Sequence, residues 1–179
     1  HRGPDAPARL LEAALREFLW AFDHSGEFPE LSGVRVSYWL RTISRFGASY
    51  PPALAAMRTR RDRSREAVMA GRVNAETVGD LSSLNDYLKE GPKTLEVYDS
   101  LVRSRRLRAA DRELFFRWIF GMLMDKRRYV DVVAAVPDPV AVAKGEIEGV
   151  AGFKKYASKF SRAQRREILG YLREDAVGK

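Results

Sequence analysis

Apolar side chains recur at steps of three and four residues along most of the chain, which is the period of an amphipathic α-helix. The first stripe covers roughly residues 7–23 and the second roughly 33–48. No stretch alternates apolar and polar residues in the way a half-buried strand does. The pattern therefore predicts an all-α fold of about eight helices.

Proline, glycine and capping residues place several helix boundaries. The pair Pro51–Pro52 ends the second helix and can open a third, which is expected to stop at Gly71. Asn74 is the predicted N-cap of a fourth helix, and Gly91–Pro92 separates it from a shorter fifth one. Because the predicted connections are short, we expect antiparallel helical hairpins stacked on one another.

The second half of the chain contains the most apolar predicted helix. Residues 111–125 are apolar on nearly every side, so we expect this helix to be buried centrally. A short helix is predicted at 129–136, and Ser161 with Gln164 forms a predicted capping box for a terminal helix. We expect a single all-helical domain over residues 1–179, with sub-units at 5–71, 74–136 and 138–179.

Composition restricts the chemistry that this chain of 179 residues can perform. Hydrophobic residues make up 45% and aromatic residues 11%, enough for a packed core and unlike a disordered chain. The absence of cysteine excludes disulfides, thiolate zinc sites and cysteine nucleophiles. With His1 and His24 as its two histidines and no glycine-rich phosphate loop, the sequence predicts no catalytic residues, no metal and no cofactor. We therefore expect a protein that is not an enzyme, and an enzyme of unrecognised type is the weakest of the hypotheses.

No segment of the sequence has the pattern of a membrane span. The longest apolar run, 114–124, is interrupted by Arg117 and Gly121 and is about half the ~20 residues that a spanning helix needs. The first residues contain no continuous apolar stretch of the kind that signal peptides have. We expect a cytoplasmic protein without a membrane partner.

Two pieces of the chain carry a resemblance to a known group of proteins. Residues 31–40 (LSGVRVSYWL), 50–54 (YPPAL) and the pair Arg61–Asp62 resemble uncharacterised bacterial tetratricopeptide-like (TPR-like) helical-repeat proteins. Residues 118–133 are similar to a tetratricopeptide hairpin, with 125–129 (DKRRY) at the turn. The resemblance implies a short curved α-solenoid that binds another macromolecule, with no activity assigned.

Positive charge is concentrated in blocks. The net charge is +8, and residues 41–72 hold eight basic against two acidic residues. Residues 103–128 hold nine against three and residues 154–179 eight against three, whereas 73–102 hold two basic and six acidic residues. A folded solenoid could gather the basic blocks on one surface.

Arginines on the predicted third helix give the main candidate site. Arg58, Arg61 and Arg65 fall within roughly 60° of one another on a helix, inside an otherwise apolar sector. One interpretation is a solvated, salt-bridged helix, in which Asp62 pairs with Arg58 and the acidic fourth helix, through Asp80 and Asp86, supplies other partners. The other is a groove for an acidic ligand. Four further candidate partner-binding residues are Trp20, Tyr38, Arg41 and Arg45.

Two functional hypotheses are consistent with these features. The leading one is a scaffold that binds an acidic segment or surface of a protein partner through a concave, partly arginine-lined face, in a regulatory, adaptor or immunity-type role. The alternative is a nucleic-acid-binding helical protein whose binding is driven by phosphate contacts and is weakly specific. The oligomeric state is left open.

Overall fold

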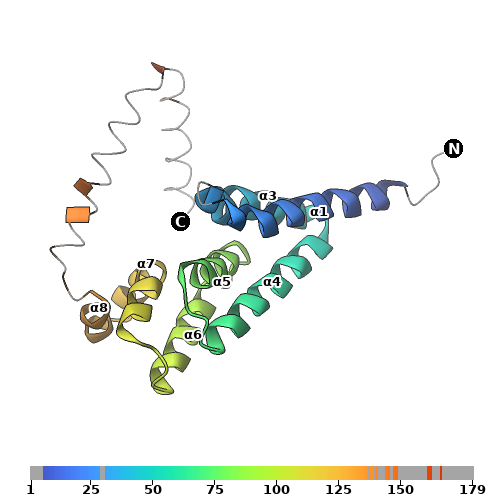
Figure 1. The fold of residues 1–179 in the computed structure, drawn as a ribbon. Helices are drawn as coiled ribbons and strands as arrows, with labels where there is room; N and C mark the ends of the chain where they lie inside the picture. Colours follow the sequence, from blue (N-terminus) through green and yellow to red (C-terminus); the bar gives the residue numbers. More distant parts are fainter. Residues whose placement is uncertain are drawn as a thin grey trace. The chain divides into compact units, whose positions relative to one another are not determined.

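Helices account for nearly all of the chain that the structure describes. The computed structural model describes residues 6–28, 31–136 and nine single positions between 138 and 166. Seven helices of seven or more residues lie in this part, and it contains no strand (Figure 1): α1 (Ala6–His24), α3 (Leu40–Ser49), α4 (Pro51–Met69), α5 (Ala75–Tyr87), α6 (Pro92–Arg103), α7 (Ala109–Asp125) and α8 (Tyr129–Ala135). The all-α prediction is confirmed for the described residues.

The chain divides into two units, His1–Ala135 and Val136–Lys179. All seven helices belong to the first unit. The predicted capping box lies outside the described residues because Gln164 is not among them. The single domain with three sub-units stays a prediction.

Three short helical turns lead from α1 into α3. They are η1 (Ser25–Glu27), α2 (Ser32–Val34) and η3 (Arg35–Trp39), and the last has the wide winding of a π-helix. Together α2, η3 and α3 form the continuous helix that the sequence predicts at about 33–48. The apolar period did not predict the π turn, which carries the buried side chain of Arg35.

Four consecutive helices, α4 to α7, end in the same backbone arrangement. A residue with positive φ follows each helix: Gly71 (91°), Lys89 (61°), Arg105 (55°) and Arg127 (54°). The N–H of the next residue then bonds back across the last turn, as in Arg72 N to Ala67 O at 2.9 Å. This is the Schellman motif, which satisfies the last carbonyls of a helix and reverses the chain. The predicted stop at Gly71 is confirmed, and at the other three ends a basic residue takes the place of glycine.

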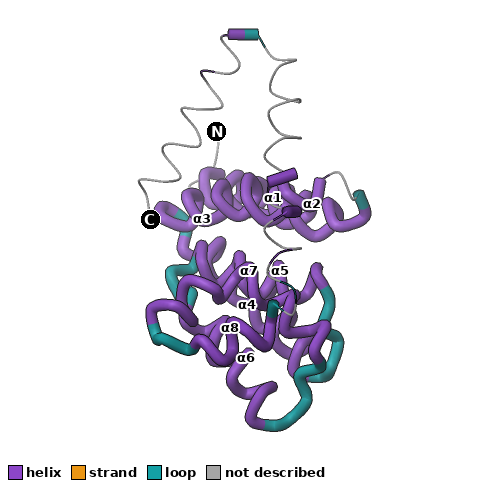
Figure 2. The backbone as a smooth tube through the Cα atoms, turned by 90° about the vertical axis from the view of Figure 1, so that its left-hand side faces the viewer, coloured by secondary structure: helices purple, strands orange, loops and turns teal. Residues whose placement is uncertain are grey.

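Chain reversal places successive helices side by side. The pairs α3–α4, α4–α5, α5–α6, α6–α7 and α7–α8 are in contact, as are the next-but-one pairs α3–α5, α4–α6 and α5–α7. Figure 2 shows α4 to α8 gathered in this way, with α1 and α3 lying together beyond α5 and α7. Helix α5 is in contact with α3, α4, α6 and α7, so it lies at the centre of this unit.

The predicted central position of residues 111–125 is wrong. Helix α7 buries one stripe with a spacing of four, ending in Phe115, Ile119 and Leu123, while Phe120 and Met124 are 43% and 40% exposed. The buried helix is α5, in which all eight residues from 78 to 85 are buried. The small and polar side chains of α5 allow neighbouring helices to approach it from several sides. Helix α7 has larger side chains and is covered by neighbours along one stripe only.

Two apolar clusters meet at α5. One contains Val78 and Leu81 of α5 with residues of α4, α6 and α7, including Tyr98 and Phe115. The other contains Leu84 with residues of α1, α3 and α4. Two buried polar residues of α5, Asp80 and Asn85, form hydrogen bonds with side chains of other elements.

Candidate functional site

An ion pair fixes the first buried polar residue of α5. Asp80 is 7% exposed and accepts a hydrogen bond from Arg35 Nη1, and Arg35 Nη2 lies 3.7 Å from Glu76. Arg35 Nε also donates to the carbonyl of Phe22 at 3.0 Å, and its guanidinium lies 4.5 Å from the centre of the Phe22 ring. Burial raises the pKa of Asp80 to about 6 although Arg35 acts in the opposite direction. This cluster joins α1, η3 and α5.

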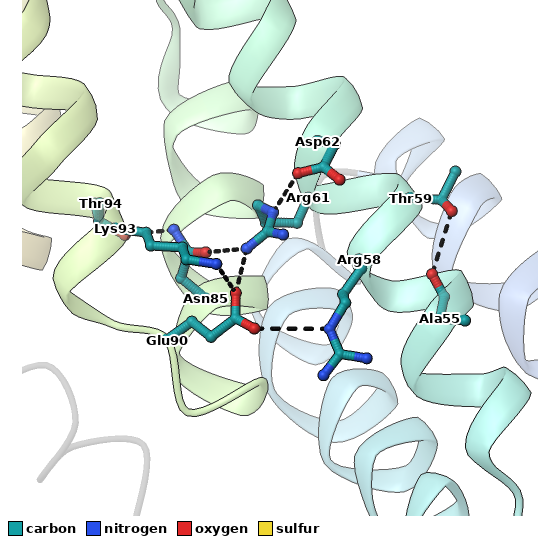
Figure 3. Close-up of polar contacts among 9 residues, drawn as sticks. All are labelled: Ala55, Arg58, Thr59, Arg61, Asp62, Asn85, Glu90, Lys93 and Thr94. Carbon is teal, nitrogen blue, oxygen red and sulfur yellow. Dashed lines mark hydrogen bonds and ion pairs between the residues drawn. The ribbon is translucent and has the colours of Figure 1, made fainter.

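The second polar cluster surrounds Arg61 (Figure 3). Arg61 Nη1 donates to Asn85 Oδ1 at 3.1 Å and to Glu90 Oε2 at 2.5 Å, and Nε donates to Asp62 Oδ1 at 2.6 Å. Asn85, which is fully buried, donates in turn from Nδ2 to Thr94 Oγ1 at 3.0 Å. These bonds use Nε and Nη1 of Arg61 and leave out Nη2. The guanidinium is therefore held in one orientation by residues of α4, α5 and the α5–α6 turn, and Thr94 of α6 holds Asn85.

The carboxylate of Glu90 lies close to three cationic side chains in this cluster. It accepts from Arg61 and from Lys93 Nζ at 2.7 Å, and Arg58 Nε lies 3.6 Å away. Hydrogen bonds from Lys93 and Arg61 lower the pKa of Glu90 to about 2. The backbone positions it, because Glu90 N donates to Asn85 O at 2.7 Å in the Schellman motif that ends α5.

These contacts correct the predicted pairing of the arginines. Asp62 pairs with Arg61 and not with Arg58, and Asp80 pairs with Arg35 and not with an arginine of α4. A spacing of four on a helix makes an Arg58–Asp62 pair available, but Glu90 in the α5–α6 turn, which the sequence did not single out, competes for Arg58.

A cleft opens beside Arg61, between α4, α5 and α6. Its volume is about 430 Å³, within the range of ligand sites. The lining consists of four basic residues, two acidic ones, two polar ones and three apolar ones: Arg61, Arg65, Lys93, Arg103, Asp62, Glu96, Asn85, Ser100, Met69, Leu81 and Val97. The lining residues therefore carry a formal net charge of +2, and Glu90, beside the cleft, pairs with Arg61 and Lys93.

Two of the four cations in the cleft have no carboxylate partner. Arg61 and Lys93 both pair with Glu90, whereas no ion pair joins Arg65 or Arg103 to any residue that the structure describes. Arg65 is exposed on α4, one turn beyond Arg61, and Arg103 is exposed at the end of α6. The cleft thus presents two uncommitted guanidiniums from two different helices next to a fixed one.

Arginines away from the cleft hold helices together. Arg60 binds Asp23 through two hydrogen bonds of 2.8 and 2.5 Å, which joins α4 to α1. Arg128 lies 2.6 Å from Asp99 and 2.8 Å from Asp131, which joins the α7–α8 turn to α6 and α8. Arg60 and Arg128 therefore form ion pairs that connect helices.

The remaining predicted site residues lie on other elements and do not line the cleft. Trp20 is 61% exposed and stacks on His24 with ring centres 4.6 Å apart, and His24 Nδ1–H donates to Trp20 O at 2.9 Å. Tyr38 is 53% exposed on η3, and Arg41 and Arg45 follow it on α3. The structure brings together Arg61 and Arg65 in the cleft, with Arg58 attached through Glu90.

Sequence reasoning missed the α6 wall of the cleft. Lys93, Glu96, Ser100 and Arg103 follow one another at spacings of three and four, so they share one face of α6. That spacing is visible in the sequence, but it did not show that this face lies opposite α4.

No group of three or more histidine or acidic side chains in the described part of the chain is arranged to hold a metal ion. Among the described helices, none combines the length and the apolar character needed to cross a lipid bilayer. Comparisons with protein-family models, with curated proteins and with solved structures found no match.

Proposed function

We propose that this chain is a non-enzymatic helical interaction domain that binds an acidic segment of a protein partner in the cleft between α4, α5 and α6. The observation that carries the proposal is the contrast within the cleft between two paired cations and two that have no described partner, Arg65 and Arg103. The paired cations stabilise the fold, which accounts for their presence. Arg65 and Arg103 form no ion pair with a described residue, and they contribute positive potential to the cleft.

The electrostatics of the cleft favour an acidic occupant. Arg61 and Arg65 are four residues apart on α4, an arrangement of like charges that costs an isolated helix a few tenths of a kcal/mol. A carboxylate bound between them removes this repulsion and gains charge-assisted hydrogen bonds. Excess positive charge in a cleft also steers acidic partners toward it and raises the association rate.

The apolar part of the cleft favours a protein segment over a nucleic acid. Met69, which is half-buried, provides contact area for an apolar side chain next to the acidic one, in front of buried Leu81 and Val97. No aromatic residue is among the lining residues that the structure describes, and proteins that bind single-stranded nucleic acids usually stack bases on aromatic side chains. Binding of nucleic acid to exposed arginines elsewhere is therefore the competing hypothesis in the test.

A TPR-like solenoid is part of the same proposal. It is supported by the contacts of each helix from α3 to α7 with its neighbour and next-but-one neighbour, which is how stacked helical hairpins pack. Solenoids of this kind bind extended segments along their helices, which agrees with a cleft formed by three successive helices.

Selection from a displayed random peptide library tests the proposal. Peptides selected on the wild-type chain are expected to be enriched in Asp or Glu next to an apolar residue. Their affinity, measured by fluorescence anisotropy, is expected to fall about tenfold or more in the Arg65→Ala/Arg103→Ala variant, because each charge-assisted bond contributes more than a neutral one.

Arg63→Ala is the matched control, since Arg63 is exposed on the same helix and does not line the cleft. We expect it to leave peptide affinity unchanged. Selected peptides that lack acidic residues, or that bind the double variant as well as the wild type, would contradict the proposal. Displacement of the peptides by oligothymidylate in the wild type, and equally in the double variant, would favour the nucleic-acid hypothesis.

A further inference from the structure

The arginines of the cleft present more N–H donors than one carboxylate can accept from. Arg61 is held by Asp62, Asn85 and Glu90 and keeps Nη2 out of those bonds. Arg65 approaches from the same helix and Arg103 from α6. Three guanidiniums from two helices therefore border one space, and a guanidinium presents up to five N–H donors in a rigid plane.

The charge of the cleft points to a dianion. Asp62 and Glu90 pair with Arg61 and Lys93, whereas Arg65 and Arg103 have no ion pair with a described residue, and one singly charged carboxylate would compensate only one of these two. A phosphoryl group carries about −1.5 to −2 charges near neutral pH and has three acceptor oxygens, enough for donors that come from different directions. Ser100 adds a hydroxyl donor on the α6 wall.

Arg61 resembles a preorganised anchor because its orientation is set before any ligand arrives. Its hydrogen bonds to buried Asn85 and to Glu90 fix the side chain, and the fixed donor loses little conformational entropy on binding. Clusters of arginines are the usual means by which proteins recognise phosphorylated segments.

We propose that the acidic group bound in this cleft is a phosphorylated side chain of a partner protein, held by Arg61, Arg65 and Arg103 with its flanking apolar residue on Met69. This inference rests on the proposed function and names the chemistry of its ligand. Binding of the partner then depends on phosphorylation, which adds the second negative charge.

Glu96 supplies an internal check on this inference. It lines the cleft on α6, and its carboxylate repels a bound anion. Replacing Glu96 by glutamine removes that repulsion and keeps the shape of the side chain, so the variant is expected to bind the phosphoryl group several-fold more tightly.

The experiment is an NMR titration of the full chain labelled with ¹⁵N. The probes are acetylated tripeptides Leu-X-Leu in which X is phosphoserine, glutamate or serine, together with inorganic phosphate and hexathymidylate. The phosphoserine peptide is expected to shift the amides around Arg65, Ser100 and Arg103 and to bind at least about fivefold more tightly than the glutamate peptide. The serine peptide is expected not to bind.

Variants assign the effect to the cleft. Arg65→Ala and Arg103→Ala should each weaken the phosphoserine peptide about tenfold, Glu96→Gln should strengthen it, and Arg63→Ala should change nothing. Equal affinity for the phosphoserine and glutamate peptides would overturn the phosphate inference and leave the proposed function intact. Inorganic phosphate or hexathymidylate binding as tightly as the phosphopeptide would also overturn it. If neither acidic peptide shifted the cleft amides and the library peptides were insensitive to Arg65 and Arg103, both proposals would fail.

Discussion

Removing Arg35 is the sharpest test of how the first unit is held together. In Arg35→Met an apolar side chain can still pack on Phe22, but Asp80, which is 7% exposed in the wild type, loses its guanidinium partner. The Phe22 carbonyl keeps the hydroxyl of Ser25, which donates to it at 3.0 Å. The main cost is therefore an uncompensated buried carboxylate, which we expect to lower the free energy of unfolding by about 3–5 kcal/mol near neutral pH.

The pKa of Asp80 gives the pH dependence and its sign. Burial raises this pKa to about 6, whereas in the unfolded chain an aspartate titrates near 4. A raised pKa stabilises the folded state below about pH 4, and that stability is lost as the pH rises through about 6. Two pKa units correspond to roughly 3 kcal/mol. Without Arg35 the pKa rises further, so the loss extends to higher pH, and the cost of Arg35→Met is smaller at about pH 5 than near pH 7.

Urea unfolding followed by circular dichroism at several pH values measures these effects. Asp80→Asn removes the titrating group, so the difference in unfolding free energy between wild type and this variant should change by roughly 2 kcal/mol between about pH 4 and pH 6. The double variant Arg35→Met/Asp80→Leu replaces the pair by apolar side chains and is expected to be within about 1 kcal/mol of the wild type. The reasoning is refuted if Arg35→Met costs less than about 1 kcal/mol near neutral pH, or if Asp80→Asn has the same pH profile as the wild type.

Three smaller predictions concern local features and are measured by urea unfolding. Asn74 accepts from Thr77 N at 2.9 Å as the N-cap of α5, so Asn74→Ala should cost about 1 kcal/mol. Asn85→Leu removes one of the two acceptors of Arg61 Nη1 and leaves buried Thr94 Oγ1 without its donor, so it should cost about 1–3 kcal/mol, while an unchanged midpoint would show that water replaces the amide. Arg127 has a φ of 54° after α7, so Arg127→Gly should raise stability by up to about 1 kcal/mol, and a loss would indicate a contact of its side chain.

Local signals in the sequence predicted the helices well. Asn74 is the N-cap of α5 as predicted, and the helix that begins at Pro51 ends before Gly71 as predicted. These features depend on residues a few positions apart, so the sequence contains the information directly. The π turn at Arg35–Trp39 was missed because a single wide turn hardly changes the apolar period.

Tertiary position could not be predicted in the same way. Residues 111–125 have the larger apolar content, yet α5, with buried Asp80 and Asn85, lies at the centre. Hydrophobicity shows how much surface a helix can bury, whereas the number of neighbours depends on the order in which helices stack. The partner of Asp80 is 45 positions away in the sequence, and no local pattern indicates such a pair.

The sequence predicted the α4 side of the candidate cleft but not its α6 side. Arg61 and Arg65 share a helix, so their common face follows from the helical period, but Arg103 joins them through the packing of α6 beside α4. Arg58 belongs to the same predicted stripe, and Glu90 draws it into the polar cluster at the end of α5. In this arginine stripe, the acidic residues that the fold places nearby therefore determine which side chains form ion pairs and which stay free to bind a ligand.

Arg61 both stabilises the fold and lines the cleft, so substitutions at Arg61 cannot separate function from stability. Its hydrogen bonds to Asp62, Asn85 and Glu90 stabilise the contact of α4 with α5, and the same side chain forms a wall of the cleft. Replacing it would therefore lower stability and affinity together, and the two losses could not be distinguished. Arg65 and Arg103 are exposed and have no described ion pair, so their removal should cost the fold little. A loss of binding in those variants without a loss of stability would show that the charges of the cleft act on a ligand.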